Sequence, residues 1–146
     1  MISEFDGKYA FLSNFYHSPI THDGIEYPTV EHFFQAMKTL DIAECKAIAA
    51  ADTPGKAKRM GRTVKLRPNW EKVKAYYMEL GLRLKFANQK LAQKLINTGD
   101  EELIEGNTWH DRTWGRCVCP KCGGQGQNLL GQLLMKLRDE IRNEEK

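Results

Sequence analysis

The sequence predicts a mainly helical, compact single domain with one or two small β-hairpins. Apolar residues recur at helical spacing over most of the chain, whereas the strand and turn signals are confined to short segments. No repeat, linker or long charge block divides the 146 residues. Because this length is ordinary for one domain, the predicted domain covers residues 1–146.

The first predicted elements are a hairpin and a helix. The hairpin covers Pro19–Tyr27 and turns at His22-Asp23-Gly24, because an Asp-Gly pair favours a tight turn. The helix begins after Thr29, a residue type that caps helix N-termini. One face of this helix is apolar and is expected to be buried. This apolar stripe consists of Val30, Phe33, Phe34, Met37 and Leu40.

Five further helices are predicted. The first covers about Ile42 to Ala51, and the second runs from Thr53-Pro54, a cap followed by a proline in the first turn, to about Gly61. A long helix begins near Asn69-Trp70, and two more follow it. The apolar stripes of these last three are Val73, Tyr76, Tyr77, Leu80 and Leu84; then Leu91, Leu95 and Ile96; then Leu129, Leu130, Leu133, Leu134, Leu137 and Ile141.

Composition excludes several classes of protein. With 41% hydrophobic and 28% charged residues, the chain does not resemble a disordered protein. The longest apolar stretch, Ala47–Ala51, is far shorter than the roughly 18 residues of a membrane span. Acidic residues at the N-terminus argue against a secretory or transit peptide, so we expect a cytoplasmic protein. A net charge of +3 does not by itself imply nucleic-acid binding.

The first predicted helix carries a candidate catalytic face. Glu31, Gln35 and Lys38 are spaced i, i+4, i+7, so a carboxylate and an amine project from the same side. The same spacing is also typical of a solvated face with an ordinary ladder of ion pairs.

A second candidate lies in the loop Trp109–Gly115, where Trp109 and Trp114 flank Asp111. Such rings can stack on a nucleobase while the carboxylate reaches the bond to be cut. The alternative is a surface loop pinned by tryptophans that pack into the core. Together, Glu31 and Asp111 would supply the two carboxylates that cleavage of a glycosidic bond requires.

A basic cluster suits phosphate oxygens. It consists of Lys56, Lys58, Arg59, Arg62, Lys65 and Arg67. Arg59 and Arg62 are explained equally well without a ligand, because cationic side chains are favoured near the negative C-terminal end of a helix dipole.

The four cysteines are a poor disulfide framework, because three are clustered and Cys45 is remote. Cys117, Cys119 and Cys122 include a Cys-Pro-x-Cys-Gly segment that is typical of half a zinc ribbon. Since a structural zinc needs four ligands, Cys45 or His110 would have to complete the set. The alternative is a loop of reduced, exposed cysteines, and the sequence predicts no cofactor.

Seven blocks in order make the sequence resemble the NADAR (YbiA-like) family over nearly its whole length. The blocks are Phe11–Phe15, Tyr27–Lys38, Ala57–Arg62, Leu66–Trp70, Leu84–Phe86, Trp109–Gly115 and Gly126–Arg138. The cysteine loop departs from the family pattern, in which a cysteine-free, Gly-rich connection is expected before the last helix.

The resemblance implies a compact helical fold and hydrolysis of N-glycosidic bonds between ribose C1 and an exocyclic amine. The first expected substrate is ADP-ribosylated guanine in DNA, and the second is a ribosylaminopyrimidine phosphate of riboflavin synthesis. Glu31 would act as acid and base at the amine, and Asp111 would stabilise positive charge on the ribose or position water. Lys38 would hold phosphate or ribose hydroxyls, or attack C1 and form a transient Schiff base.

The resemblance also implies the substrate-binding residues. Stacking is expected from Phe15, Trp70 and Trp114, and phosphate binding from Arg59 and Arg62. The complete predicted binding set is Asn14, Phe15, Gln35, Arg59, Arg62, Trp70, Trp114 and Gly115. The expected partners are ADP-ribosylated nucleic acid or a ribosylated small molecule, with neither a membrane nor a protein partner. Two alternatives come from other functional classes: a non-catalytic module that binds ADP-ribose or NAD, and a zinc-knuckle interaction protein.

Overall fold

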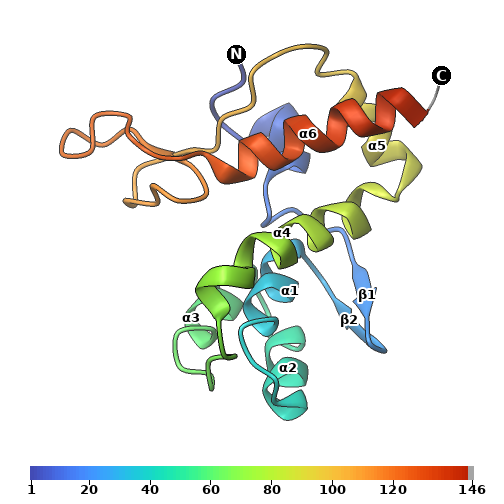
Figure 1. Ribbon diagram of the computed structural model, residues 1–146, viewed down its shortest axis with the longest axis vertical. Helices are drawn as coiled ribbons and strands as arrows, with labels where there is room; N and C mark the ends of the chain where they lie inside the picture. Colours follow the sequence, from blue (N-terminus) through green and yellow to red (C-terminus); the bar gives the residue numbers. More distant parts are fainter. Residues whose placement is uncertain (145–146) are drawn as a thin grey trace. The chain divides into compact units, whose positions relative to one another are not determined.

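A computed structural model describes residues 1–144 (Figure 1). The contacts of the chain cluster into two compact units, Asn14–Phe86 and a second unit made of Met1–Ser13 with the chain from Ala87 onward. That residues 1–146 form a single domain stays a prediction. Helices dominate the described residues, as predicted. None of the helices within residues 1–144 is long and apolar enough to cross a membrane.

The unit Asn14–Phe86 opens with the predicted hairpin. Strands β1 (Ile20–His22) and β2 (Ile25–Tyr27) pair antiparallel, with Ile20 opposite Tyr27. Asp23 and Gly24 at the turn have φ values of 50° and 77°. Both values are positive, as a type I′ turn requires, and the Asp-Gly signal therefore identified the hairpin correctly.

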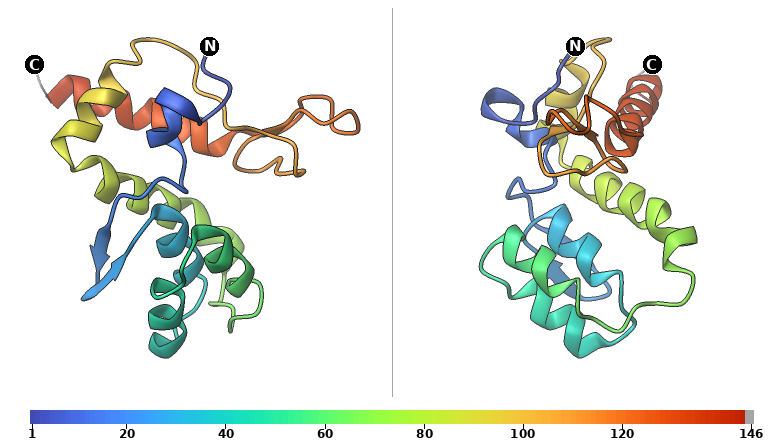
Figure 2. Two further views of the ribbon diagram at one scale, coloured as in Figure 1. Left: turned by 180° about the vertical axis from the view of Figure 1, so that it is seen from behind. Right: turned by 90° about the vertical axis from the view of Figure 1, so that its left-hand side faces the viewer.

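Helix α1 (Val30–Ala36) is the centre of this unit, and all of its residues are buried. The Thr29 hydroxyl caps it by accepting a hydrogen bond from the His32 N–H. Helices α2 (Ile42–Ala49), α3 (Pro54–Met60) and α4 (Trp70–Phe86) contact α1 (Figures 1 and 2). Because α1 ends at Ala36, the prediction for Leu40 was wrong: this residue lies beyond the helix and is 64% exposed.

The predicted apolar stripe of α4 was wrong for Tyr76, while its other members, Val73, Tyr77, Leu80 and Leu84, are half-buried. Tyr76 is 64% exposed, and the buried side chains are instead Met78, Leu82 and Phe86, together with Lys85. The helix turns this face inward at Gly81, where a Cβ atom would lie 2.9 Å from the Phe33 ring. A close approach of this kind depends on the partner helix, so spacing within α4 could not reveal it.

The second unit contains a 3₁₀ helix (η1, Gly7–Leu12) and helices α5 (Gln89–Ile96) and α6 (Leu129–Glu144). Ile2 bridges Leu103 at the edge of this unit. The second small sheet is not a hairpin, because β3 (Gly106–Asn107) and β4 (Arg116–Cys117) pair in parallel. The loop between β3 and β4 carries Asp111, Cys117 ends β4, and the loop after β4 carries Cys119 and Cys122.

Candidate active site

A buried carboxylate lies in the first turn of α1. Glu31 is only 7% exposed, and its Oε1 accepts a hydrogen bond of 2.8 Å from Gln35 Nε2. The i, i+4 spacing on one helix face brings these two groups together, as the sequence predicted. The backbone N–H of Glu31 donates to the Asn14 carbonyl at 3.1 Å, which places the loop residue Asn14 beside the start of the helix.

Two side-chain amide oxygens beside α1 are buried acceptors. Asn14 Oδ1 and Gln35 Oε1 have no hydrogen-bond partner among the groups that the structure describes. The amide nitrogens are engaged, since Asn14 Nδ2 donates to Met78 Sδ at 3.3 Å and Gln35 Nε2 donates to Glu31. Buried polar groups are normally paired, so these oxygens suit a ligand that presents N–H or O–H donors.

Lys38 lies in the turn after α1 and is half-buried. Burial lowers the pKa of its ammonium group, the charges of Arg62 and Lys58 lower it further, and Glu31 and Glu71 oppose the change. A lowered pKa increases the fraction of neutral amine, which is the form that can act as a nucleophile.

The predicted phosphate cluster is divided by the structure. Lys58 and Arg62 act on Lys38 electrostatically, whereas the Arg59 guanidinium lies beside Gly55 of its own helix. Arg67 has a structural role, because its Nε donates to the Met37 carbonyl at 2.8 Å and its Nη1 donates to the Tyr77 hydroxyl at 3.0 Å. Lys38 therefore interacts electrostatically with the Glu31 carboxylate and also with two members of the cluster, Lys58 and Arg62.

The aromatic candidates of this unit have different surroundings. Trp70 is 6% exposed, packs on Phe34 with ring centroids 5.2 Å apart, and stacks on Tyr77 at 6.3 Å. This ring is therefore part of the core and does not present an open face to a base. Phe15, next to the buried Asn14, is 47% exposed and keeps a large accessible surface.

Sequence reasoning missed Lys85. This side chain is almost fully buried, and burial lowers its pKa to about 7. Its Nζ lies 5.5 Å from the centre of the Tyr16 ring and 5.2 Å from that of Phe86. Its burial could have been predicted from its position seven residues after Met78, because this spacing puts both residues on the same, buried face of the helix.

In the second unit, Asp111 shapes its own loop. Its Oδ1 accepts hydrogen bonds from the backbone N–H groups of Thr113 at 3.1 Å and Trp114 at 2.9 Å. The Asn107 side chain holds the backbone of Asp111 at both its N–H and its carbonyl. Such bonds are typical of an Asx turn. Because Glu31 and Asp111 belong to different units, their predicted pairing stays a prediction.

The other two predicted residues of this loop also have structural surroundings. Trp114 is half-buried, which partly supports the alternative that tryptophans pin the loop. Gly115 is buried, and a Cβ atom there would overlap the Glu105 carbonyl oxygen. A close backbone approach therefore accounts for this glycine without a ligand.

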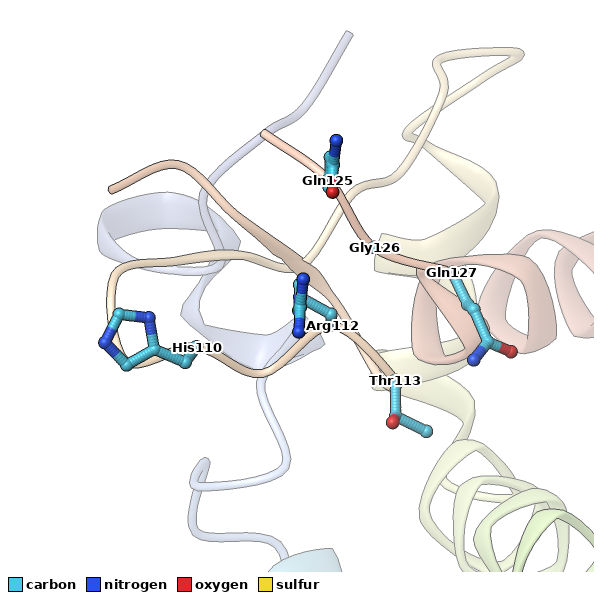
Figure 3. A pocket seen from close by; sticks show the side chains of 6 residues that line it. All are labelled: His110, Arg112, Thr113, Gln125, Gly126 and Gln127. Carbon is cyan, nitrogen blue, oxygen red and sulfur yellow. The ribbon is translucent and has the colours of Figure 1, made fainter. Parts of the chain in front are cut away.

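An open pocket of about 530 Å³ lies between segments 110–113 and 125–127 of the same unit (Figure 3). It is lined by His110, Arg112, Thr113, Gln125, Gly126 and Gln127. Neither Asp111 nor Trp114 lines it. The guanidinium of Arg112 and the two glutamine side chains give the pocket a polar lining.

The profile of the NADAR domain matches residues 3–142. This chain belongs to the NADAR domain family. It is 41% identical to the N-glycosidase YbiA of Escherichia coli K12 over 136 residues, which cover 91% of this chain and 82% of that protein. It is 34% identical to a riboflavin biosynthesis protein of Vibrio vulnificus over 140 residues, which cover 94% of this chain and 37% of that protein.

The fold comparison agrees with the sequence comparisons. The NMR structure of E. coli YbiA matches with a TM-score of 0.83 and 38% identity, covering 99% of this chain and 87% of that one. The predicted resemblance to the NADAR family and the mainly helical fold are therefore confirmed.

Proposed function

We propose that this chain, a hydrolase acting on N-glycosyl bonds, removes ADP-ribose from ADP-ribosylated guanine in DNA. The bond to be cut joins ribose C1 to the exocyclic amine of the base. The observation that carries the proposal is the burial of three kinds of acceptor, namely the Glu31 carboxylate, to which Gln35 donates, and the amide oxygens of Asn14 and Gln35. The naming of curated relatives as N-glycosidases supports the reaction class.

In the proposed reaction, Glu31 serves the leaving amine. An amine leaves only when it is protonated, so the reaction needs a general acid at the nitrogen. In the proposed reaction, Glu31 gives its proton to the exocyclic nitrogen as the C1–N bond breaks, and the resulting carboxylate then takes a proton from water. Gln35 orients the carboxylate through its bond to Oε1.

The two amide oxygens fit the donors of such a substrate. Ribose offers hydroxyl groups and guanine offers ring N–H groups, and each can donate to a carbonyl oxygen. In the proposed complex, Asn14 Oδ1 and Gln35 Oε1 accept these hydrogen bonds. A site built to pair such donors discriminates strongly against analogues that lack them.

Two roles follow for Lys38 in the proposed reaction. As a cation beside Lys58 and Arg62, it binds the diphosphate of ADP-ribose. As a neutral amine, its Nζ bonds to C1 while the C1–N bond to the base breaks, and the Lys38 proton passes to the departing amine through Glu31. Opening of the ribose ring gives an imine, and water hydrolyses it to release the sugar and the free lysine.

The remaining predicted residues have supporting parts in the proposal. Phe15 offers an exposed ring for stacking on the base, and Arg59 and Arg62 extend the positive charge along the phosphates. The roles that the resemblance implies for Asp111 and Trp114 are stabilisation of positive charge on the ribose and stacking on the base. These roles stay predictions.

The deciding experiment compares wild type, Glu31→Gln and Glu26→Gln on a guanine-ADP-ribosylated DNA oligonucleotide, with mass spectrometry of the released sugar. Glu26 is an exposed glutamate of β2 and provides a matched control. Wild type and Glu26→Gln are expected to release ADP-ribose, and Glu31→Gln is expected to lose turnover by at least about 100-fold, since general acid–base catalysis contributes 10²–10⁴-fold. Full activity of Glu31→Gln would refute the role of this carboxylate.

The second candidate substrate is a ribosylaminopyrimidine phosphate. It is favoured by the Vibrio vulnificus relative, which is named a riboflavin biosynthesis protein. The same three proteins should be assayed on this compound in parallel. Turnover of the small molecule alone would make it the substrate class, and retained ADP-ribose binding without turnover of either compound would indicate a non-catalytic binding module.

Borohydride reduction tests the covalent role of Lys38. With wild type and substrate, reduction should leave a sugar adduct on the Lys38 peptide, and Lys38→Arg should give none. Turnover without an adduct in wild type would leave Lys38 only its phosphate-binding role.

A further inference from the structure

Four metal-ligating side chains meet close to one another: His110, directly before Asp111, and the three clustered cysteines after it. The Nδ1 atom of His110 lies 3.3 Å from Cys122 Sγ, 3.5 Å from Cys119 Sγ and 3.8 Å from Cys117 Sγ. All four ligand atoms lie within 4.8 Å of one another. We infer that His110, Cys117, Cys119 and Cys122 bind one Zn²⁺ ion in a structural site.

The distances fit a tetrahedron of zinc ligands. With Zn–S and Zn–N bonds of roughly 2.3 and 2.05 Å, the tetrahedral edges are about 3.6 Å between nitrogen and sulfur and about 3.8 Å between two sulfurs. The three distances from the His110 nitrogen match the first value within a few tenths of an ångström. Three thiolates and one imidazole are a frequent ligand set for structural zinc.

The backbone around the cysteines has the form of a metal-binding knuckle. The Cys122 N–H donates to Cys119 Sγ at 3.4 Å, and the Gly123 N–H donates to the Cys119 carbonyl at 2.9 Å. Gly123 and Gly124 have φ values of 63° and 83°, a left-handed region that favours glycine. An N–H group directed at sulfur stabilises a thiolate, which is the form that binds metal.

The cysteines do not form an exposed loop, so that alternative from the sequence was wrong for two of them. Cys117 and Cys122 are buried and Cys119 is half-buried, and all of them are free thiols. A disulfide would use two sulfurs and leave the third thiol and the imidazole unexplained, whereas one tetrahedral metal uses all four groups. The fourth ligand is His110; the other candidate, Cys45, directs its thiol to the Ala36 carbonyl at 3.4 Å.

A closed site of this kind stabilises the loop and takes no part in bond cleavage. Zn²⁺ with three thiolates and a neutral imidazole has a single net negative charge, and the cationic residues Arg112, Arg116 and Lys121 lie close to the ligands in the sequence. Binding releases up to three thiol protons to solvent. Since His110 precedes Asp111 and has a φ of 70°, the metal would hold the backbone in this conformation where the Asp111 turn begins.

The first test is metal analysis of the purified full chain. Elemental analysis should find about one zinc per chain in wild type and in the control Cys45→Ser, and well under half an equivalent in Cys119→Ser, Cys122→Ser and His110→Gln. No zinc in a folded wild type that also fails to bind added zinc would overturn the inference. Equal zinc in wild type and all three ligand variants would also overturn it.

Cobalt spectroscopy on wild type keeps the test valid if the ligand variants fail to fold. Zinc-free, reduced wild type should bind one Co²⁺ and show the intense ligand-field bands of tetrahedral coordination, with thiolate-to-cobalt charge-transfer absorption from three sulfurs. Added Zn²⁺ should displace the Co²⁺ and remove these bands. An octahedral cobalt spectrum, or no binding, would refute the tetrahedral site. Neither measurement depends on the N-glycosidase reaction.

Discussion

Replacement of Gly61 by alanine should uncouple Gln35 from Glu31. Gly61 caps α3 and lies against the Gln35 side chain. A Cβ atom on residue 61 would overlap Gln35 Oε1 and lie 2.8 Å from its Cδ. The Gln35 amide would have to rotate away, and the hydrogen bond of 2.8 Å from Nε2 to Glu31 Oε1 would break.

The magnitude follows from the groups involved. Breaking this bond would leave a buried polar group unpaired, which costs about 1–3 kcal/mol, because Gln35 is buried and water does not replace its partner. The backbone itself tolerates alanine, because Gly61 has a helical φ of −62°, and this recovers up to about 1 kcal/mol of helix propensity. We expect a net loss of about 1–2 kcal/mol in the free energy of unfolding, or roughly 3–8 °C in Tm.

The matched control is Gly55→Ala in the same helix. A Cβ atom there would meet only Arg59 Nη1 and Thr53 Oγ1, both at 3.9 Å. Thermal unfolding by circular dichroism and turnover of the ADP-ribosylated oligonucleotide would be measured for both variants. Gly61→Ala should lower Tm and reduce kcat at least tenfold through misplacement of the carboxylate, while Gly55→Ala should do neither. The reasoning would be refuted if the two variants behaved alike, or if Gly61→Ala had its full effect in a Gln35→Ala background.

Three further predictions test other parts of the chain. Trp70→Ala should cost about 3–5 kcal/mol of unfolding free energy in urea denaturation and Tyr76→Ala less than about 1 kcal/mol, because only the first ring is buried; similar losses would contradict the place of Trp70 in the core. Burial lowers the pKa of Lys85 to about 7, so between pH 7 and 10 this amine binds more protons in the unfolded chain than in the folded one. The contribution of Lys85 to the free energy of unfolding should therefore rise with pH, by up to about 1.4 kcal/mol per pH unit. Lys85→Met should flatten that rise in denaturation curves at pH 7 and 9.5, and an unchanged slope would exclude Lys85 as its source. Asp111→Asn keeps an oxygen that can accept the hydrogen bonds from Thr113 and Trp114, so this variant should keep the wild-type Tm and lose turnover. Asp111→Ala should lower both Tm and turnover. Full turnover of Asp111→Asn would leave this residue only its structural role.

Local sequence signals were sufficient for most of the elements. The Asp23-Gly24 turn and the Thr29 cap were correctly identified, because each acts through atoms only a few residues away. The i, i+4 contact of Glu31 with Gln35 was predictable for the same reason. The end of α1 was placed too late, since apolar periodicity continues to Leu40 beyond the last helical turn.

Contacts between distant residues explain what spacing could not predict. The apolar spacing in α4 predicted that Tyr76 is buried. Instead, the close approach of Phe33 at Gly81 turns a different face of the helix inward and buries Lys85. An aromatic ring in a family motif suggested stacking for Trp70, yet its neighbours are Phe34 and Tyr77. Both outcomes depend on which helices pack together, and that is a property of the whole unit.

The sequence by itself determined the helical class of this protein, its hairpin and its helix caps, because these depend on hydrogen bonds between residues close in the chain. It also determined the membership in the NADAR family, because the order of the family motifs can be recognised without a structure. Only the tertiary structure decided that Glu31, Asn14 and Gln35 are buried and that the amide oxygens of Asn14 and Gln35 stay unpaired among the described groups. It also decided that His110 joins the three cysteines. Burial and metal-ligand geometry depend on distances between residues that the folded backbone brings together, and such distances are fixed only when the helices and loops have packed.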